Sequence, residues 1–304
     1  MPELPRKGPK KPKATLITFM VLVLAGILYL GWNYHAGNLP WQQAGQELEP
    51  KVKWLEGKTG EEDTGTVAPA GEDQAKLHLA LGEDSSPATP QNECLQTTDK
   101  IFLFFEHLDR QGYIREFGLQ GSSLEHFTNI IKKLMANPPV VVRETDDLFA
   151  ILNNMAHFFR VLGPKDILFI KDVLIHEREI IEPTMALFYK WSEIEPTCPG
   201  TGLDIELPLA GLYEYAGYFI NTLGGQSYLF RRQPYLRLLV RYYSVLIIDR
   251  ANSIDANLYG IDIRYTLDSL ISEINGNENL IDKEKYLQNL AKLQDKYQVK
   301  YGAN

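Results

Sequence analysis

The stretch Thr97–Leu108, TTDKIFLFFEHL, places large apolar side chains at Ile101, Phe104, Phe105 and Leu108. Intervals of three and four residues bring such side chains onto one face of an α-helix. The alternation of apolar and polar residues that marks a half-buried β-strand is nearly missing from here to the end of the sequence. This stretch and the residues after it therefore predict an all-α fold.

The same period predicts several further helices. They are expected over residues 124–134, 148–162, 165–191, 207–223, 234–259, 261–275 and 282–297. Pro183 predicts a kink or a boundary in the third of these segments, because proline lacks the N–H that a helix interior uses. Ser122 and Glu125 have the spacing of a capping box. Residues 94–304 are long enough for one core, and we expect an irregular helical bundle or a short stack of helical hairpins.

A second segment, Ala14–Trp32, contains nineteen residues without a charge and follows five lysines or arginines. At about 1.5 Å per residue, such a helix spans the hydrocarbon core of a bilayer. We predict one transmembrane helix over residues 14–34, with residues 1–13 as a basic cytoplasmic tail and the rest of the chain outside. A cleaved signal peptide and a buried core helix are the alternatives, and the length of the run and the aromatic residues that end it favour an anchor.

Residues 35–93 connect this segment to the helical region. They are rich in proline, glycine and acidic residues and poor in large apolar side chains. Such a composition buries too little apolar surface to offset the entropy of ordering. We expect a flexible acidic linker with an end-to-end distance of about 40 Å.

The distribution of charge along the sequence indicates which classes of molecule the chain can bind. The tail carries a net charge of +4, whereas residues 36–90 and 91–304 each carry −6. Nucleic-acid binding needs a positive surface, so we predict no nucleic-acid partner. The basic tail is suited to lipid headgroups, and the bilayer is a predicted partner.

Two cysteines, Cys94 and Cys198, lie in the predicted outer region. A disulfide between them is chemically permitted outside the cytoplasm. Sequence does not show whether the two Cα atoms lie close enough, so a bonded and an unbonded pair both stay open.

Tyrosine and arginine are concentrated between residues 213 and 243, and both types are enriched at interface hot spots. The predicted binding surface consists of Arg231, Arg232, Arg237, Arg241, Tyr235 and Tyr242. Arg237 and Arg241 are four residues apart and share a helix face, where they can meet a carboxylate or an acidic partner. The alternative is structural, because the same helix is rich in leucine and its arginines can pair with internal acids.

The sequence contains no motif that identifies an enzyme or a metal protein. Histidines neighbour glutamates in several places, but no Glu-x-x-His or His-Glu-x-x-His pair occurs, so we predict no metal and no cofactor. Glu206 and Glu214 lie on an apolar, tyrosine-rich segment, where burial raises a carboxyl pKa and makes either a candidate general acid. An enzymatic role stays open but is not favoured.

These features predict a non-catalytic interaction or scaffold module of the cell envelope. We expect it in a bacterial inner membrane, with the N-terminus in the cytoplasm, the helical domain in the periplasm and an envelope protein as its partner. An envelope hydrolase or transferase that acts on cell-wall sugars is the first alternative. A sensor whose outer domain binds a ligand is the second.

Overall fold

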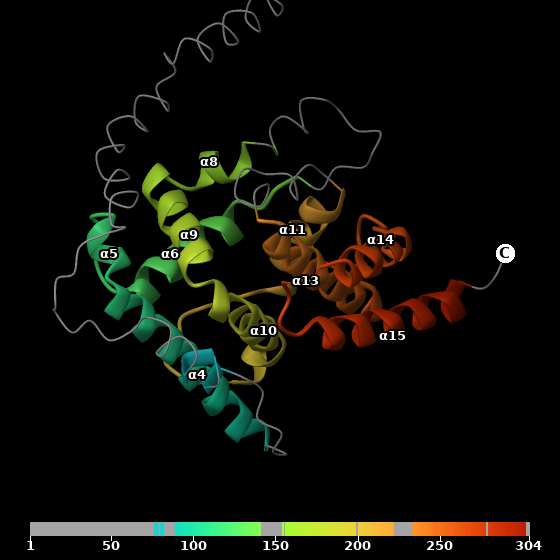
Figure 1. Cartoon of the computed structure of the whole chain (residues 1–304), viewed down its shortest axis with the longest axis horizontal. Helices are drawn as coiled ribbons and strands as arrows, with labels where there is room; N and C mark the ends of the chain where they lie inside the picture. Colours follow the sequence, from blue (N-terminus) through green and yellow to red (C-terminus); the bar gives the residue numbers. More distant parts are fainter. Residues whose placement is uncertain are drawn as a thin grey trace, which may run out of the picture. The chain divides into compact units, whose positions relative to one another are not determined.

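The computed structural model describes residues 76–78, 80–81, 89–140, 154, 156–198, 200–221, 233–277 and 279–301. Within these ranges every regular element is a helix, which confirms the predicted all-α class (Figure 1). The described residues belong to one compact unit, Ala68–Asn304. The predicted tail, the transmembrane segment and most of the predicted linker lie outside the described residues. None of the described helices has both the length and the apolarity to span a bilayer.

The first group of helices is built around α4. Its members are α4 (Pro90–Gln111), α5 (Tyr113–Glu116), α6 (Ser123–Ala136), α8 (His157–Val161), α9 (Pro164–His176) and α10 (Arg178–Ile194). Helix α4 packs against both α6 and α10. Phe104 and Phe105, from the stretch that predicted the fold, are buried and meet edge to face with ring centroids 5.1 Å apart.

The second group surrounds α13. Its members are α11 (Leu209–Asn221), α13 (Pro234–Ser253), α14 (Arg264–Asn275) and α15 (Lys283–Tyr301), whereas the short 3₁₀ helix η1 (Glu195–Thr197) contacts α10 of the first group. Helix α11 packs along α13, α14 pairs with α15, and α13 also contacts α14 and α10. Leu239, Val245 and Ile248 of α13 are completely buried. Helix α13 is therefore the central element that joins the two groups.

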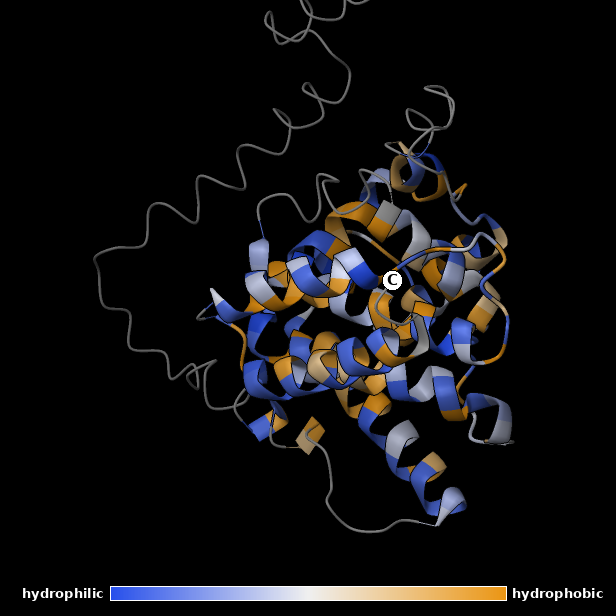
Figure 2. Cartoon of the chain, turned by 90° about the vertical axis from the view of Figure 1, so that its right-hand side faces the viewer, coloured by the Kyte–Doolittle hydropathy of each residue, from blue (hydrophilic) through white to orange (hydrophobic). Residues whose placement is uncertain are grey.

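The helices are amphipathic. Figure 2 shows hydrophilic and hydrophobic residues interspersed along them, as expected where one stripe of each helix faces the core. The buried side chains of both groups form one hydrophobic cluster.

The helix expected over residues 165–191 is in fact two helices, and the boundary between them does not fall at Pro183. Helix α9 ends at His176 and α10 begins at Arg178, so the break falls at Glu177. The carboxylate of Glu177 is buried and accepts hydrogen bonds from His107 and Tyr113, both at 2.7 Å. Pro183 lies inside α10. The buried hydrogen bonds of Glu177 fix the position of the break between α9 and α10.

Helix α4 begins earlier than expected, inside the segment predicted as linker. Its first residue is Pro90, and the fixed φ of proline suits a first helical position. Leu77 and Leu81, which also belong to the predicted linker, are buried in the core cluster. Ordered structure therefore extends N-terminal to residue 94.

The predicted capping box is confirmed, and a glycine ends an earlier helix. Ser122 Oγ accepts from the Glu125 backbone N–H at 3.2 Å, and the Glu125 carboxylate accepts from Ser122 N–H at 3.0 Å, which is a complete capping box. Gly112 ends α4 with φ of 80°, a left-handed conformation that favours glycine.

Cys94 and Cys198 are joined by a disulfide, with their Cα atoms 5.5 Å apart. The bond links α4 to the loop that follows η1. The same loop is fixed further along by Trp191, whose indole N–H donates to the carbonyl of Ile205 at 2.8 Å. Two regions about one hundred residues apart are thereby held together.

Candidate functional site

The predicted arginine-rich surface is engaged in a contact between helices. Arg241 pairs with Glu273 of α14 and donates to Ser269 Oγ at 2.9 Å, while Arg237 Nη2 lies 3.4 Å from the same Glu273 carboxylate. The pairing gives both arginines a structural role between α13 and α14. Arg231 and Arg232 lie outside the described residues.

The two predicted tyrosines have different surroundings. The hydroxyl of Tyr242 accepts from Asn289 at 2.9 Å, and its ring lies 4.4 Å from the ring of Tyr286, inside the core. Tyr235 is also buried and donates its hydroxyl to the carbonyl of Leu174 at 3.0 Å. One side of the Tyr235 ring, however, borders a pocket.

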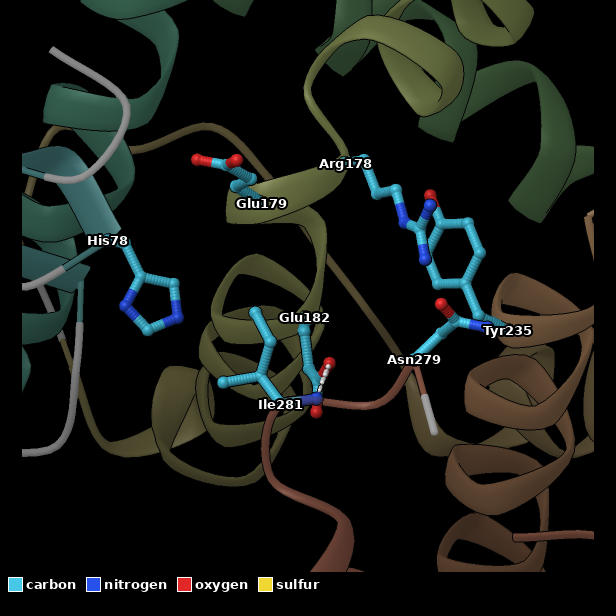
Figure 3. A pocket seen from close by; sticks show the side chains of 7 residues that line it. All are labelled: His78, Arg178, Glu179, Glu182, Tyr235, Asn279 and Ile281. Carbon is cyan, nitrogen blue, oxygen red and sulfur yellow. Dashed lines mark hydrogen bonds between the residues drawn. The ribbon is translucent and has the colours of Figure 1, made fainter. Parts of the chain in front are cut away.

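This pocket has a volume of about 590 Å³ and lies where α10 and α13 begin. It is lined by His78, Arg178, Glu179, Glu182, Tyr235, Asn279 and Ile281. Figure 3 shows Arg178 and Tyr235 on one side and His78 and Glu179 on the other, with Glu182 and Ile281 between them. The volume is within the range of small-molecule and cofactor sites.

Buried hydrogen bonds next to the pocket fix where α10 begins. Because Glu177 is held by His107 and Tyr113, the chain turns there and α10 starts at Arg178. Burial and the neighbouring Glu177 raise the pKa of Tyr113 far above its ordinary value, so the phenol remains a hydrogen-bond donor. Arg178 and Glu179 thus project from a fixed helix start.

Glu182 has a structural task in the pocket wall. It is 2% exposed, and its carboxylate accepts the backbone N–H groups of Ile281 and Asp282 at 2.9 and 2.7 Å. Ile281 and Asp282 directly precede α15, so Glu182 ties the start of that helix to α10. Its negative charge is already neutralised in part by these donors.

Arg178 has a different environment. Its guanidinium carbon lies 4.7 Å from the centre of the Tyr235 ring, which is cation–π geometry. Burial raises the pKa of Tyr235 above its ordinary value, and the nearby positive charge of Arg178 opposes that change. Among the ion pairs within the described part of the chain, none involves Arg178.

The guanidinium of Arg178 lies over the Tyr235 ring and carries N–H donors in a fork that matches a carboxylate or phosphate. Asn279 lines the same pocket as Arg178 and Tyr235 (Figure 3). Glu179 and His78 provide hydrogen-bonding groups on the opposite side of the pocket. The arrangement is suited to a polar ligand with an anionic group at the Arg178 end.

Other candidates from the sequence lie elsewhere. Glu206 is exposed in the segment before α11, because that helix begins at Leu209. Glu214 is half-buried on α11, and burial raises the pKa of its carboxyl group. Neither residue lines the pocket. Across the described residues, no group of three or more histidine, cysteine or acidic side chains is placed to hold a metal ion.

Of the four predicted binding residues that the structure describes, only Tyr235 lines the pocket, and sequence reasoning missed Arg178. In the sequence, the segment from His176 to Glu179 resembles only an incomplete metal motif. The signal that identifies Arg178 is its stacking on a ring 57 positions further along the chain. Such a contact has no pattern in the sequence.

Comparisons with known proteins give no further guide to this site. No protein-family model matches the chain, no curated protein matches it, and no solved structure matches it.

Proposed function

We propose that the chain is a single-pass, membrane-anchored interaction module of the bacterial cell envelope. Residues 14–34 hold it in the inner membrane, and the helical domain faces the periplasm. There it binds a carboxylate-bearing segment of an envelope protein through the Arg178–Tyr235 pocket.

One observation carries the binding part of this proposal. Arg178 is stacked on Tyr235 at the edge of an open pocket, and none of the ion pairs within the described ranges includes it. An arginine whose orientation is already restricted loses less entropy when it binds a carboxylate. Tyrosine and arginine are also the side chains most enriched at interface hot spots. Arg237 and Arg241, by contrast, are occupied by Glu273.

The disulfide supports the proposed location. Bonds of this kind form and persist in oxidising compartments, which include the periplasm. The acidic charge of residues 91–304 favours a protein partner over a nucleic acid.

The test is a quantitative pull-down of the full tagged chain after cross-linking in its native membrane. Arg178→Gln removes the charge at the pocket, and Arg110→Gln removes an exposed arginine at the end of α4 as the matched control. We expect the same defined set of envelope proteins with the unaltered chain and with Arg110→Gln. Recovery of that set should fall by about tenfold with Arg178→Gln, because a hydrogen bond to a charged group contributes about 1.5 to 3 kcal/mol.

Equal recovery with both variants would contradict the claim that the partner binds at the Arg178–Tyr235 pocket. Recovery of no specific protein with any of the three chains would remove the interaction role itself.

The hydrolase or transferase alternative rests on a single residue. Burial raises the pKa of Glu214, as a general acid requires. This alternative predicts that purified full chain hydrolyses cell-wall glycan and that Glu214→Gln abolishes the reaction. Activity that survives Glu214→Gln would exclude Glu214 as the acid.

A further inference from the structure

Large apolar side chains are exposed at one end of the α13, α14 and α15 group. Leu258, Tyr265 and Val299 are 82%, 84% and 86% exposed, and Ile254 and Tyr259 are also exposed. We call these five residues the tip patch. The structure describes eleven exposed large hydrophobic residues, and five of them belong to the tip patch. Exposed apolar side chains are therefore concentrated at this end of the molecule.

Contacts between α13 and α15 bring two parts of the patch to the same end. The amino group of Lys296 donates to Ser253 Oγ at 3.3 Å. Ser253 is the last residue of α13 and directly precedes Ile254, while Val299 lies one turn beyond Lys296 on α15. The end of α13 and the last turns of α15 therefore lie together.

Contacts of α14 and of the loop before it place Tyr265, Tyr259 and Leu258 at the same end of the molecule. Gln294 of α15 donates to Asp268 at 2.6 Å, so the first turn of α14, which carries Tyr265, lies beside the last turns of α15. In the connecting loop, the ring of Tyr259 stacks on Tyr213 with an interplanar angle of 2°. The loop is thus fixed by one aromatic residue while its neighbour Leu258 faces solvent.

Two pairs of charges next to the patch neutralise each other, whereas the exposed Asp255 beside Ile254 belongs to none of the ion pairs among the described residues. Lys296 contacts Asp249 at 2.6 Å, and Arg264 contacts Asp262 at 2.7 Å. The patch is therefore mainly apolar, with one carboxylate, that of Asp255, at its edge. A partner recognised by charge is not favoured at this end of the molecule.

We propose that the tip patch inserts into the interfacial region of the lipid bilayer to which the chain is anchored. This inference rests on the proposed anchor. Three of its five side chains are more than 80% exposed, and exposed apolar residues that gather in one place often mark an interaction or membrane surface. Five side chains are far fewer than the roughly 20 to 30 residues that each partner contributes to a stable protein interface, which argues against a second copy.

The tether removes the need for high affinity. The chain between the predicted anchor and α4 keeps the domain within tens of ångströms of the bilayer, so even weak insertion is effectively intramolecular. Tyrosine side chains are favoured at the level of the lipid headgroups.

The experiment uses the full chain reconstituted in vesicles of neutral phosphatidylcholine, with or without anionic phosphatidylglycerol. Because Cys94 and Cys198 are bonded to each other, Leu258→Cys introduces a single free thiol for an environment-sensitive dye. Leu103→Cys provides the matched control, since Leu103 is exposed on α4, which packs against α6 and α10. Brominated lipids serve as quenchers.

We expect a blue shift and quenching by brominated lipid at position 258 and neither at position 103. The signal should be equal in neutral and anionic vesicles, persist in high salt and decrease in the Tyr265→Ser variant. A chain that floats with the vesicles but shows no shift at position 258 would overturn the inference while the anchor stands. A chain that does not float would overturn both. Dye self-quenching that disappears on dilution with unlabelled chain would instead identify an interface between copies.

Discussion

At the scale of single residues, His157 connects protonation to stability. It is completely buried on α8, and Arg160 Nη2 lies 3.3 Å from its Nδ1 atom, which must accept. Its Nε2–H therefore donates to the hydroxyl of Tyr215 at 2.9 Å, and that hydroxyl donates to the carbonyl of Leu134. Burial first, and the charge of Arg160 second, lower the pKa of His157 to about 4.

This environment predicts that acid destabilises the protein between about pH 6.5 and pH 4. In that window the unfolded chain binds the His157 proton more tightly than the folded chain does, so the free energy of unfolding decreases as pH falls. At pH 5 the loss from His157 is about 2 kcal/mol. Urea unfolding at pH 7 and pH 5 should show a smaller difference for His157→Gln than for the unaltered chain. Identical pH dependence in the two chains would contradict the assignment.

Glu177 is the second residue whose contacts can be tested directly. Glu177→Ala removes the carboxylate that pairs with His107 and Tyr113 and leaves both partners buried. We expect the free energy of unfolding to fall by about 3 kcal/mol, because each buried polar group without a partner costs about 1 to 3 kcal/mol. The control is Glu179→Ala, two residues later and exposed, for which a change within about 0.5 kcal/mol is expected. Similar losses in the two variants would contradict the structural role of Glu177.

At the scale of helices, the pair of α13 and α14 shows what local pattern predicts and what it misses. The spacing of Arg237 and Arg241 predicts correctly that they share a helix face, but the acid that faces them, Glu273, comes from a different helix. The break between α9 and α10 is similar. Proline chemistry favours Pro183, whereas the actual break at Glu177 depends on His107 and Tyr113 from other helices.

The pairing between these helices predicts a stability effect. Arg241→Gln should lower the free energy of unfolding by about 1 kcal/mol, and a double-mutant cycle with Glu273→Gln should give a coupling of similar size. Partner recovery from membranes should be unchanged, because the two residues face each other. Loss of the partner with unchanged stability would restore this face as the binding surface.

At the scale of the whole molecule, the disulfide between Cys94 and Cys198 closes a loop of about one hundred residues. The chain-entropy model gives a stabilisation of about 4 to 5 kcal/mol for a loop of this length. The double variant Cys94→Ser/Cys198→Ser should therefore unfold at much lower urea concentration than the unaltered chain in oxidising buffer. The difference should disappear when the unaltered chain is reduced. An equal midpoint in oxidising buffer would show that the bond contributes little.

Composition and periodicity predict the helical class well, because the apolar stripe of each helix is a local property. The pocket could not be predicted, since it is formed by Arg178, Tyr235 and Asn279 from separate segments. Tyr235 was predicted as a binding residue only because tyrosine and arginine are concentrated in that part of the sequence. Of the helix predicted over residues 148–162, the structure describes residue 154 and residues 156–162, in which α8 begins at His157. The remainder of that prediction lies outside the described residues.

The most direct test of the central claim is a photo-crosslinking amino acid placed at Ile281 in the full chain in its native membrane. Ile281 lines the pocket and is 53% exposed, and Leu95 on α4 is 54% exposed and provides the matched control position. We predict a defined adduct with an envelope protein from position 281 and none from position 95. The adduct should be lost when Arg178→Gln is added. An adduct that persists in Arg178→Gln, or no adduct from position 281, would contradict the proposed binding site.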